Sequence, residues 1–443
     1  MVLEQLLIYG AVTLFCLGVL WIYLKKLKKT SKEVEAKIEQ AKQDGLFEPI
    51  SLHPVIDLGT CIQSGACVLA CPEKDILGIV NGRAALINAS QCIGHGACFH
   101  ACPVEAISLV IGTEKRGVDL PHVNQDFETN VPGMYIAGEL GGMGLIKNSV
   151  EQGEAAVESI VKSGLSKKNA GYDLVIVGAG PAGISASLTA KKHGLNFLTL
   201  EQESLGGTVY NFPRSKVVMT APMDIPLFKK VKLFETSKKE LLDLWQEALA
   251  KNGIQIREQA KVDQITSAAD GFTVALASGE KIQAQRVLLA IGRRGTPRKL
   301  GIPGEELEKV AYKVLEPEMI SNKRIVVVGG GDSAIEAALA LAEQNNVILS
   351  YRGEAFSRLK PKNRENLERG RNLKQLEVML QSNLVRITEA QVEFKHSNGK
   401  PSENIENDLV FIFAGGELPT DFLKKAGIEI TTRFGYTVRK HKH

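Results

Sequence analysis

The longest apolar stretch of the chain lies near its start. Residues Gln5 to Leu24 form a run of twenty residues without a charged side chain. As a helix rising about 1.5 Å per residue, such a run spans a hydrocarbon core of about 30 Å. Glu4 precedes the run and lysines follow it, so the pattern favours a retained membrane helix over a cleavable signal peptide or a buried core helix. Tyr9, Trp21 and Tyr23 are candidate anchors at the membrane interface.

A basic and then mixed-charge segment follows the apolar run. The basic part holds five lysines, Lys25, Lys26, Lys28, Lys29 and Lys32. By the positive-inside rule, these lysines place the amino terminus outside and the remaining chain in the cytoplasm, as a single-pass protein of the bacterial inner membrane. Residues 31–45 predict a short solvated helix that ends near Gly45, which we interpret as a stalk. The predicted boundaries are an anchor at 1–30 and a stalk at 31–52.

The later part of the chain alternates short apolar strands with glycine-rich turns and helices. The strand 173–177 runs into a G-x-G-x-x-G turn made of Gly178, Gly180, Pro181, Ala182 and Gly183. Glycines at this spacing allow a tight turn and let a pyrophosphate approach the amino terminus of the following helix. The next strand, 196–200, ends in Glu201, close to the spacing expected for the carboxylate that binds an adenosine ribose. Together these features predict a dinucleotide site rather than an ordinary turn.

A second strand, turn and helix of the same kind follows. Its turn comes after the strand 324–328 and contains Gly329, Gly331, Asp332, Ser333 and Ala334. The strand after its helix ends without a carboxylate, and Arg352, Arg358 and Lys360 are available there instead. Cations at this position suit the 2′-phosphate of NADP, which we favour, while NAD with ordinary surface cations is the alternative.

Length and charge narrow the class of protein. The 443 residues predict about three domains. The formal net charge is +4, and without the five lysines after the apolar run it would be −1. The basicity is therefore local and gives no reason to expect nucleic acid as a partner.

Six of the seven cysteines lie in two copies of one pattern. The first copy holds Cys61, Cys67 and Cys71, and the second holds Cys92, Cys98 and Cys102. Both copies resemble the run C-x2-C-x2-C-x3-C-P of two-cluster ferredoxins, in which the last cysteine of each run ligates the cluster of the other run. Crossover pairing predicts one cluster held by Cys61, Cys67 and Cys102 and a second held by Cys92, Cys98 and Cys71.

Both copies lack the second cysteine of the ferredoxin pattern. Ser64 stands at that position in the first run and His95 in the second. Three thiolates suit a three-iron cluster, or a four-iron cluster whose last iron takes Ser64, His95 or an external group. A Cys3His zinc site made of Cys92, His95, Cys98 and Cys71 is an alternative, and a disulfide framework is a weaker one.

The two dinucleotide patterns resemble the thioredoxin reductase-like family of pyridine nucleotide–flavin oxidoreductases. The resemblance implies FAD at the first turn and NADP at the second. It also implies that Gly206, Gly207 and Thr208 lie against the isoalloxazine, and that residues 290–305 link the FAD and NADP domains. The segment that contains Gly138 and Glu139 is similar to the closing flavin-binding segment of the family.

That closing segment stands in an unusual place. In the family it follows the NADP domain, whereas here it precedes the first glycine turn, which predicts a circular permutation. The predicted ranges are a two-cluster ferredoxin-like domain at 53–112, the permuted FAD segment at 113–165, the FAD-binding domain at 166–295, the NAD(P)-binding domain at 296–408 and a returning FAD-domain segment at 409–443.

The chain also lacks the C-x-x-C dithiol of thioredoxin reductases. Lys313 and Glu316 stand where those cysteines align, and no cysteine follows Cys102. Reduction of a disulfide through a protein dithiol is therefore not expected. Since hydride and electron transfer depend mainly on orientation, we assign no general acid or base and no catalytic side chain.

The predicted fold class is α/β, with two Rossmann-like three-layer domains for FAD and NADP, a small α+β ferredoxin-like domain and one transmembrane helix. The predicted function is an NAD(P)H-dependent oxidoreductase that passes electrons between NAD(P)H, FAD and two iron–sulfur clusters, 3Fe-4S or 4Fe-4S. Its partners would be membrane lipid at residues 5–24 and a quinone, ferredoxin or membrane protein, with a homodimer left open. The alternatives are a flavin-dependent reductase of a small disulfide with structural clusters, and a membrane-tethered redox sensor.

Overall fold

The computed structural model covers residues 1–443, and it describes residues 2–43, 47–49, 52–73, 75–92, 94–114, 117–142, 145–165, 171–212, 217–220, 222–233, 235–268, 270–293, 296–356, 359, 361–397, 399–417 and 419–441. The chain divides into two compact units. The first unit contains residues 1–118 and 433–443, and the second contains residues 119–432.

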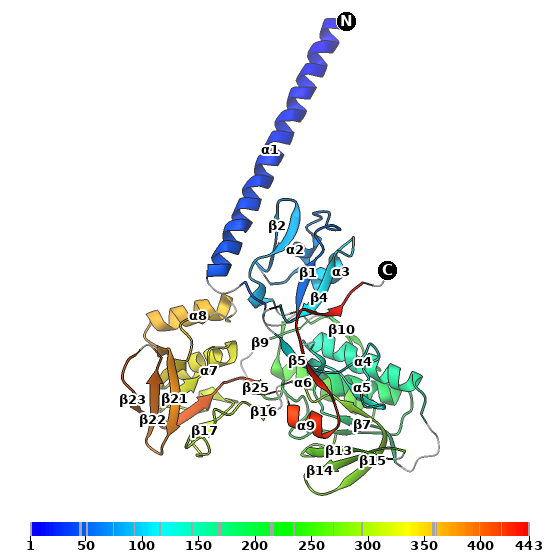
Figure 1. Cartoon of the computed structure of the whole chain (residues 1–443), viewed down its shortest axis with the longest axis vertical. Coiled ribbons are helices and arrows are strands. Elements are labelled where there is room, and N and C mark those ends of the chain that lie inside the picture. The colour runs from blue at the N-terminus through cyan, green and yellow to red at the C-terminus, as the bar shows by residue number, and fades with distance from the viewer. Residues whose placement is uncertain are drawn as a thin grey trace. The chain divides into compact units, whose positions relative to one another are not determined.

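The first unit begins with one long helix, α1 (Val2–Gln43), in which the predicted membrane helix and stalk are continuous (Figure 1). This is the one helix of the described chain that is long and apolar enough to cross a membrane, and its apolar part has no packing partner. Its second half packs on the first unit. Ala41 is buried, and a side chain at Gly78 would collide with Val34, so helix and strand approach closely there. Glycine permits this close approach.

The rest of the first unit is a small α+β fold with an internal repeat. Two short helices, α2 (Ala66–Ala70) and α3 (Ala97–Ala101), each follow a left-handed glycine, Gly65 with φ 72° and Gly96 with φ 74°. The repeated Gly-Ala-Cys of the sequence thus has a conformational reason, because glycine adopts positive φ without strain. The remaining elements are β1 (His53–Ile56), the hairpin β2 (Leu77–Val80) and β3 (Arg83–Leu86), η1 (Ala89–Gln91) and β4 (Ile107–Ile111).

The end of the chain returns to this first unit. The strand β27 (Tyr436–Arg439) pairs with β4 and completes the antiparallel sheet β1-β4-β27. The sequence analysis assigned residues 409–443 to the FAD domain as one segment, whereas residues 433–443 group with the first unit. A four-residue strand gives no local sign of the sheet it joins, because its partner lies more than three hundred residues away.

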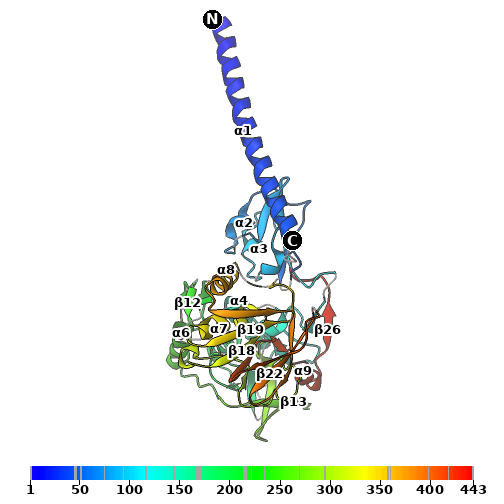
Figure 2. The same cartoon turned by 90° about the vertical axis from the view of Figure 1, so that its left-hand side faces the viewer.

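The second unit contains two mostly parallel sheets, which confirms the predicted α/β class (Figure 2). The first sheet has the order β13-β14-β15-β7-β8, and β6 also pairs with β15. Side chains of β7 alternate between its faces, with Leu174 and Ile176 in one core and Val175 and Val177 in the other, as expected for a strand buried on both sides. The strands are β6 (Met134–Ile136), β7 (Tyr172–Val177), β8 (Phe197–Leu200), β13 (Val262–Ala268), β14 (Gly271–Leu276) and β15 (Lys281–Leu289).

Helices α4 (Ile146–Lys162) and α5 (Pro181–Lys192) cross on one face of this first sheet, and Val157 and Ala186 share a core there. At the crossing, a side chain on Gly153 would come within 2.1 Å of the Ala182 carbonyl oxygen. The segment before the first glycine turn is thus packed against the helix that follows this turn.

The second sheet is parallel throughout and has the order β17-β24-β18-β19-β20. Its strand β24 (Leu409–Ile412) begins at the predicted start of the returning FAD segment, yet it belongs to this second sheet. The chain reaches the first sheet only afterwards, where Leu423 and Ile428 join its core. The other elements of this part are β17 (Val310–Ala311), β18 (Arg324–Val328), α7 (Asp332–Ala342), β19 (Asn346–Tyr351), α8 (Pro361–Asn372), β20 (Leu376–Leu380), β21 (Ser382–Ile387), β22 (Gln391–His396) and β23 (Glu403–Glu406).

Shorter elements complete the second unit. They are β5 (Val118–Pro121), η2 (Glu139–Gly141), β9 (Val217–Met219), β10 (Met223–Asp224), β11 (Lys230–Val231), β12 (Glu235–Ser237), α6 (Lys238–Lys251), β16 (Thr296–Pro297), η3 (Pro317–Met319), β25 (Gly416–Glu417), α9 (Thr420–Lys425) and β26 (Ile430–Arg433).

The connection between the two sheets turns around Glu305. Its carboxylate accepts hydrogen bonds from the amides of Leu300 and Gly301, both at 2.7 Å, and from the hydroxyl of Tyr312 at 2.8 Å. Burial alone would raise the pKa of Glu305, but these hydrogen bonds outweigh it and lower the pKa below its ordinary value of 4.5. Their contribution to stability is therefore present above about pH 4.5 and is lost as the pH falls through the lowered pKa of the folded state.

We expect Glu305→Gln to destabilise the second unit by about 1–3 kcal/mol, because the amide keeps one acceptor oxygen and turns its NH2 group toward a backbone N–H that now donates to the other carboxylate oxygen. Tyr312→Phe, which removes one bond and leaves the carboxylate, should cost less, about 0.5–1.5 kcal/mol. Urea unfolding at neutral pH measures both variants. Equal midpoints for Glu305→Gln and the unchanged protein would contradict the role given to this turn.

Candidate functional site

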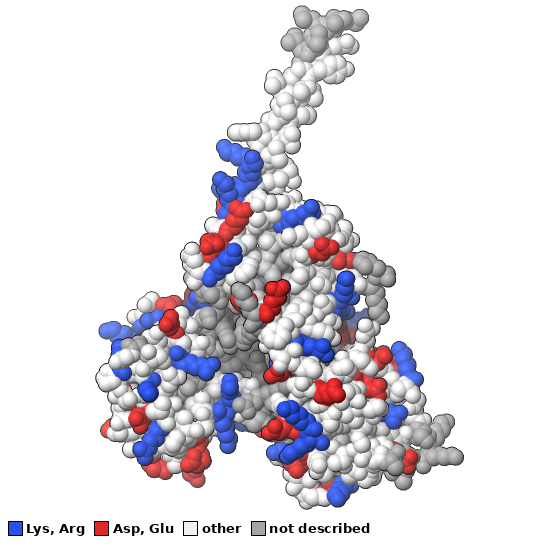
Figure 3. Space-filling view, viewed as in Figure 1, with Lys and Arg blue, Asp and Glu red and all other residues white. Residues whose placement is uncertain are grey.

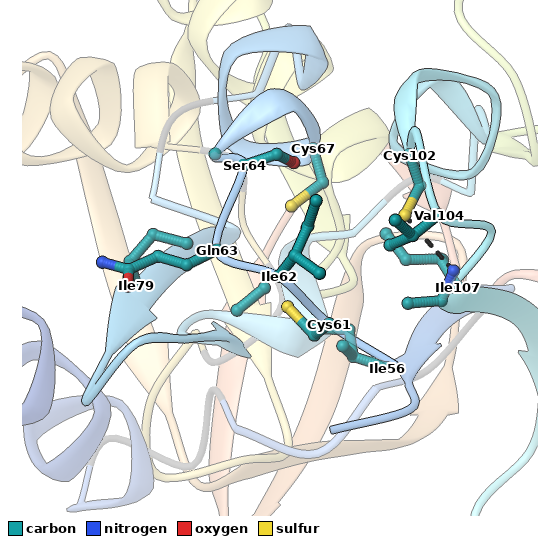
Figure 4. A pocket seen from close by; sticks show the side chains of 13 residues that line it. Ile56, Cys61, Ile62, Gln63, Ser64, Cys67, Ile79, Cys102, Val104 and Ile107 are labelled. Carbon is teal, nitrogen blue, oxygen red and sulfur yellow. Dashed lines mark hydrogen bonds between the residues drawn. The ribbon is translucent and has the colours of Figure 1, made fainter. Parts of the chain in front are cut away.

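The thiols of Cys61, Cys67 and Cys102 line one pocket, together with Ser64 (Figure 4). Its other walls are mostly apolar and include Ile56, Ile79, Val104 and Ile107. Figure 4 shows the sulfur atoms of Cys61 and Cys67 pointing toward one another, and the Cys102 sulfur accepts a hydrogen bond from the Ala106 amide at 3.3 Å. The pocket joins two cysteines of the first run with the last cysteine of the second, as crossover pairing requires. We call it the first cluster site.

The other three thiols form a second group. Burial above all, and then the neighbouring Cys92 and Cys71 thiols, raises the pKa of Cys98 to about 12. Burial, with the Cys71 thiol adding to it, also raises the pKa of Cys92 to about 11. Cys71, Cys92 and Cys98, the other crossover set, therefore lie in one neighbourhood, and Cys67 of the first cluster site also acts on Cys71 and Cys98, so the two sites adjoin. We call this group the second cluster site.

Ser64 and His95 occupy matching positions in the two repeats. Ser64 Oγ accepts from the Ala66 amide and His95 Nδ1 accepts from the Ala97 amide, both at 3.4 Å. Burial lowers the pKa of His95, which favours the neutral imidazole. Within the described part of the chain, its buried Nε2 has no hydrogen-bond partner.

The donor set is of the kind that iron–sulfur clusters use, since six cysteine thiols supply it. Among the described residues, no three His, Cys, Asp or Glu side chains lie in the arrangement of a single-ion site. A zinc ion needs its sulfur ligands about 2.3 Å from one centre, whereas the ligands of a cluster bind different irons and stand further apart. Thiols that burial keeps protonated become thiolates when cationic iron binds them.

The three glycines of the first turn have different surroundings. A side chain on Gly178, whose φ is 104°, would meet the Ala290 carbonyl oxygen at 2.6 Å, and one on Gly183 would meet the Gly178 carbonyl oxygen at 1.8 Å. At Gly180 a side chain would have nothing within 4 Å, so the open space of the turn lies there. Pro181 begins α5, and Ala182 is buried behind it. This is a cradle of the kind that a pyrophosphate occupies.

Glu201 lies at the end of β8 beside this turn, as predicted. The side chain is buried, and it accepts hydrogen bonds from the amides of Ala179 at 2.7 Å and Glu203 at 3.0 Å. Its position fixes a carboxylate against the glycine turn, where the ribose of a dinucleotide would lie.

Two further predicted pieces lie against the same turn. The amide of Gly206, φ 102°, donates to the Ala179 carbonyl at 2.9 Å, and a side chain on Gly207 would lie 3.4 Å from Gly180. Thr208 follows in an exposed position. The structure thus brings residues 206–208 to the open space at Gly180.

The segment around Gly138 also lies against this turn. A side chain on Gly138 would lie 3.1 Å from Ala182, and the Gly138 amide donates to Gln152 Oε1 at 2.9 Å. Glu139 begins η2 directly after it. Gln152 was not identified from the sequence, and it lies nearly two turns into α4.

The second glycine turn repeats the first. A side chain on Gly329, φ 149°, would meet the Phe413 carbonyl oxygen at 2.7 Å, while one on Gly331 would have nothing within 4 Å. Ala334 is buried in place of the third glycine. Asp332 begins α7 and accepts from Asn363 at 2.8 Å, and Ser333 is exposed beside it.

The predicted cations near the second turn are described only in part. Arg352 is exposed at the end of β19, next to Tyr351, whose ring would collide with a side chain on Gly330. Arg358 and Lys360 lie outside the described residues.

The positions of the missing dithiol carry charged side chains instead. Lys313 Nζ lies 3.3 Å from Glu203 Oε2 and 3.1 Å from Asn211 Oδ1. Burial lowers the pKa of Lys238 below its ordinary value, and the Glu316 carboxylate partly opposes this shift. The two contacts of Lys313 join the part of the second unit that carries the second sheet to the part that carries the first sheet.

Comparison with known proteins also distinguishes a cluster region from a dinucleotide-binding region. A family model described as pyridine nucleotide-disulphide oxidoreductase matches residues 175–441, and a model described as 4Fe-4S dicluster domain matches residues 53–103. The chain is 32% identical over 185 residues to a ferredoxin–NADP reductase of Ignicoccus hospitalis, covering 42% of this chain and 57% of that protein. The match therefore spans little more than half the length of that relative.

Two further proteins are similar over more of their length. The chain is 27% identical over 275 residues to the bacilliredoxin reductase Bdr of Bacillus subtilis, covering 59% of this chain and 82% of that protein. Among solved structures, bacillithiol disulfide reductase Bdr from Staphylococcus aureus matches with a TM-score of 0.53 at 27% identity, covering 59% of this chain and 81% of that one.

Proposed function

The chain belongs to the pyridine nucleotide-disulphide oxidoreductase family, and on that basis we propose that it is a membrane-anchored enzyme that passes electrons between NADPH, FAD and two iron–sulfur clusters. At the coarser level it is a flavin-dependent pyridine nucleotide oxidoreductase with an iron–sulfur domain. The observation that carries the finer proposal is the pocket that brings together Cys61, Cys67 and Cys102 from the two cysteine runs, in a chain that also has two glycine turns of the dinucleotide-binding kind.

The residues of the chain would bind and orient the cofactors. The turn 178–183 would hold the FAD pyrophosphate, Glu201 its ribose, and residues 206–208 with 138–139 the isoalloxazine region. The turn 329–334 and Arg352 would hold NADP. When bound, FAD accepts a hydride from the nicotinamide and the clusters carry single electrons.

A circular permutation of the FAD domain is part of the proposal. Two elements that precede the first glycine turn in the chain, β6 and α4, support it. The strand β6 pairs with β15 of the first sheet, and α4 crosses α5 where Gly153 meets Ala182. In this arrangement, the segment that closes the flavin site continues directly from the cluster domain.

Anaerobic titration of the detergent-purified, iron-reconstituted protein with NADPH tests the electron chain. We expect the flavin absorbance to bleach first and the cluster signals in electron paramagnetic resonance to change afterwards, with NADPH acting at lower concentration than NADH. Flavin bleaching with no response from iron would contradict electron transfer through the clusters.

The second candidate function is direct reduction of a small disulfide at the flavin. The similarity to proteins named bacilliredoxin reductase and bacillithiol disulfide reductase favours it. It predicts NADPH oxidation that depends on a low-molecular-weight disulfide and that survives loss of both clusters.

A further inference from the structure

The membrane helix and the cluster domain form one body. The Asn81 amide donates to Ser31 Oγ at 3.0 Å, Asn81 Nδ2 donates to Glu35 at 2.9 Å, and Lys37 pairs with Asp75 at 2.6 Å. With the close contact of Val34 and Gly78, these bonds span two turns of α1. Figure 1 shows β2 beside the lower part of this helix, and the two elements are in contact. The position of the hairpin along α1 is therefore fixed.

The contact begins close to the end of the apolar run. Leu24 and Ser31 are seven residues apart, which is about 10 Å along a helix. A headgroup layer adds about 5–8 Å to each side of the hydrocarbon core. The hairpin turn at Asn81 would thus lie at the outer edge of the headgroups if α1 crosses the membrane along its normal.

Positive charge lines the intervening stretch. Figure 3 shows the lysines of α1 gathered just below its uncharged part, and all of them are exposed in the structure. They are Lys25, Lys26, Lys28, Lys29 and Lys32. Each basic side chain near an anionic surface contributes about 1 kcal/mol of attraction, so anionic headgroups are the chemistry that this region fits.

The hairpin runs with its turn toward the membrane end of α1. Its start, at Asp75, pairs with Lys37, and its turn, at Asn81, bonds Ser31, one to two helical turns nearer the apolar run. A side chain on Gly82 in this turn would lie 3.1 Å from Gln63, and Arg83 donates a hydrogen bond to the Cys61 carbonyl.

The first cluster site therefore lies at the turn end of the hairpin, since Gln63, Ile79 and Ala84 line its pocket. The second cluster site lies toward the open end. The Asn88 amide donates to the Asp75 carbonyl there at 3.2 Å, and Cys92 follows four residues later, with its thiol 3.6 Å from the Leu52 carbonyl.

We propose that the hairpin turn 81–83 and the adjoining loop 61–64 rest on anionic lipid headgroups, with the first cluster site nearer the membrane than the second. This rests on the membrane anchor of the proposed function. Of the two clusters, the one held by Cys61, Cys67 and Cys102 is then nearer to an acceptor held in the bilayer.

Tryptophan quenching in nanodiscs that contain phosphatidylglycerol tests both the membrane anchor and the inference that rests on it. The chain has two tryptophans, of which Trp21 is exposed on α1 and Trp245 is buried in the second unit. Quenching of Trp21 by lipids with nitroxide in the acyl chain tests the anchor alone. Absence of that quenching would overturn the anchor, and this inference with it.

The inference itself is tested with Trp21→Phe as background and nitroxide on the lipid headgroup. Ile62→Trp reports on the proposed lipid-facing loop, where Ile62 is 62% exposed. Gln43→Trp is the matched control, since Gln43 is exposed on the same helix about 29 Å beyond Leu24. We expect the added fluorescence of Ile62→Trp to fall by roughly half and that of Gln43→Trp to stay constant.

Similar quenching at both positions, or none at Ile62→Trp while Trp21 is quenched, would overturn the inference and leave the anchor in place. A second variant checks the geometry without changing the loop. Seven helix-forming residues inserted between Thr30 and Ser31 move the domain about 10 Å from the bilayer while nearly preserving the face of α1. We expect this insertion to abolish the quenching of Ile62→Trp, and unchanged quenching would also overturn the inference.

Discussion

Replacing Gly183 with alanine should strip the protein of FAD. The added carbon would lie 1.8 Å from the Gly178 carbonyl oxygen, and neither backbone segment can move without opening the turn. Overpacking of this kind costs about 1–3 kcal/mol, which corresponds to about a 5- to 150-fold loss of affinity if the cost falls on the bound state. The flavin content of the purified protein, read from its absorbance, is the measurement.

Gly180→Ala is the matched comparison within the same turn. Its added carbon would meet no protein atom within 4 Å, and its φ of −76° suits any residue, so the empty fold should keep its stability. FAD affinity should still fall, because the carbon enters the space that the pyrophosphate would occupy. Full flavin content in both variants would contradict the assignment of this turn, and a loss of thermal stability in Gly180→Ala would contradict the open space.

The parts of the molecule that follow from sequence are those with a local conformational reason. The repeat of the two cysteine runs is also a repeat of conformation, because each run carries its own glycine at positive φ, Gly65 or Gly96, before its short helix. The glycine turns were equally readable, since Gly178 and Gly183 have no room for a side chain. In these places, the residues that define the sequence motif are also the residues whose conformation the fold requires.

Long-range pairing is the part that the sequence did not reveal. The strand at 409–412 and the strand at 436–439 are short apolar or mixed segments, and their partners lie in different sheets of different units. A period of two identifies a strand but carries no information about its neighbour. The tail adds a further contact of this kind, since His441 stacks on Phe99 at 3.7 Å and lies 3.7 Å from Glu105.

The continuity of α1 was also not readable from composition. The apolar run and the charged segment were assigned to an anchor and a separate stalk because their compositions differ. One helix contains both, since Ser31, Glu35 and Lys37 find partners on the hairpin and no helix-breaking residue separates the two parts. One continuous helix fixes the distance between the cluster domain and the apolar run.

The second large effect concerns which cysteines share a cluster. Each variant Cys61→Ser, Cys71→Ser and Cys102→Ser should lose one of the two clusters, because each cluster has only three thiolates. Crossover pairing predicts that Cys61→Ser combined with Cys102→Ser removes no more iron than either change alone, leaving about half. Cys61→Ser combined with Cys71→Ser should remove nearly all of the iron, although it changes the same number of thiols.

Iron content per flavin distinguishes these pairings, and the type of cluster does not have to be assigned from a spectrum. The two changes of the first pair act on one site and are redundant, while those of the second pair act on separate sites and add. Pairing within each run would reverse the two results, since Cys61 and Cys71 would then share a cluster. The pocket shared by Cys61, Cys67 and Cys102 favours the crossover outcome. Retention of all iron in every single variant would mean that Ser64, His95 or serine itself replaces a lost thiolate, and that the cysteines are not individually required.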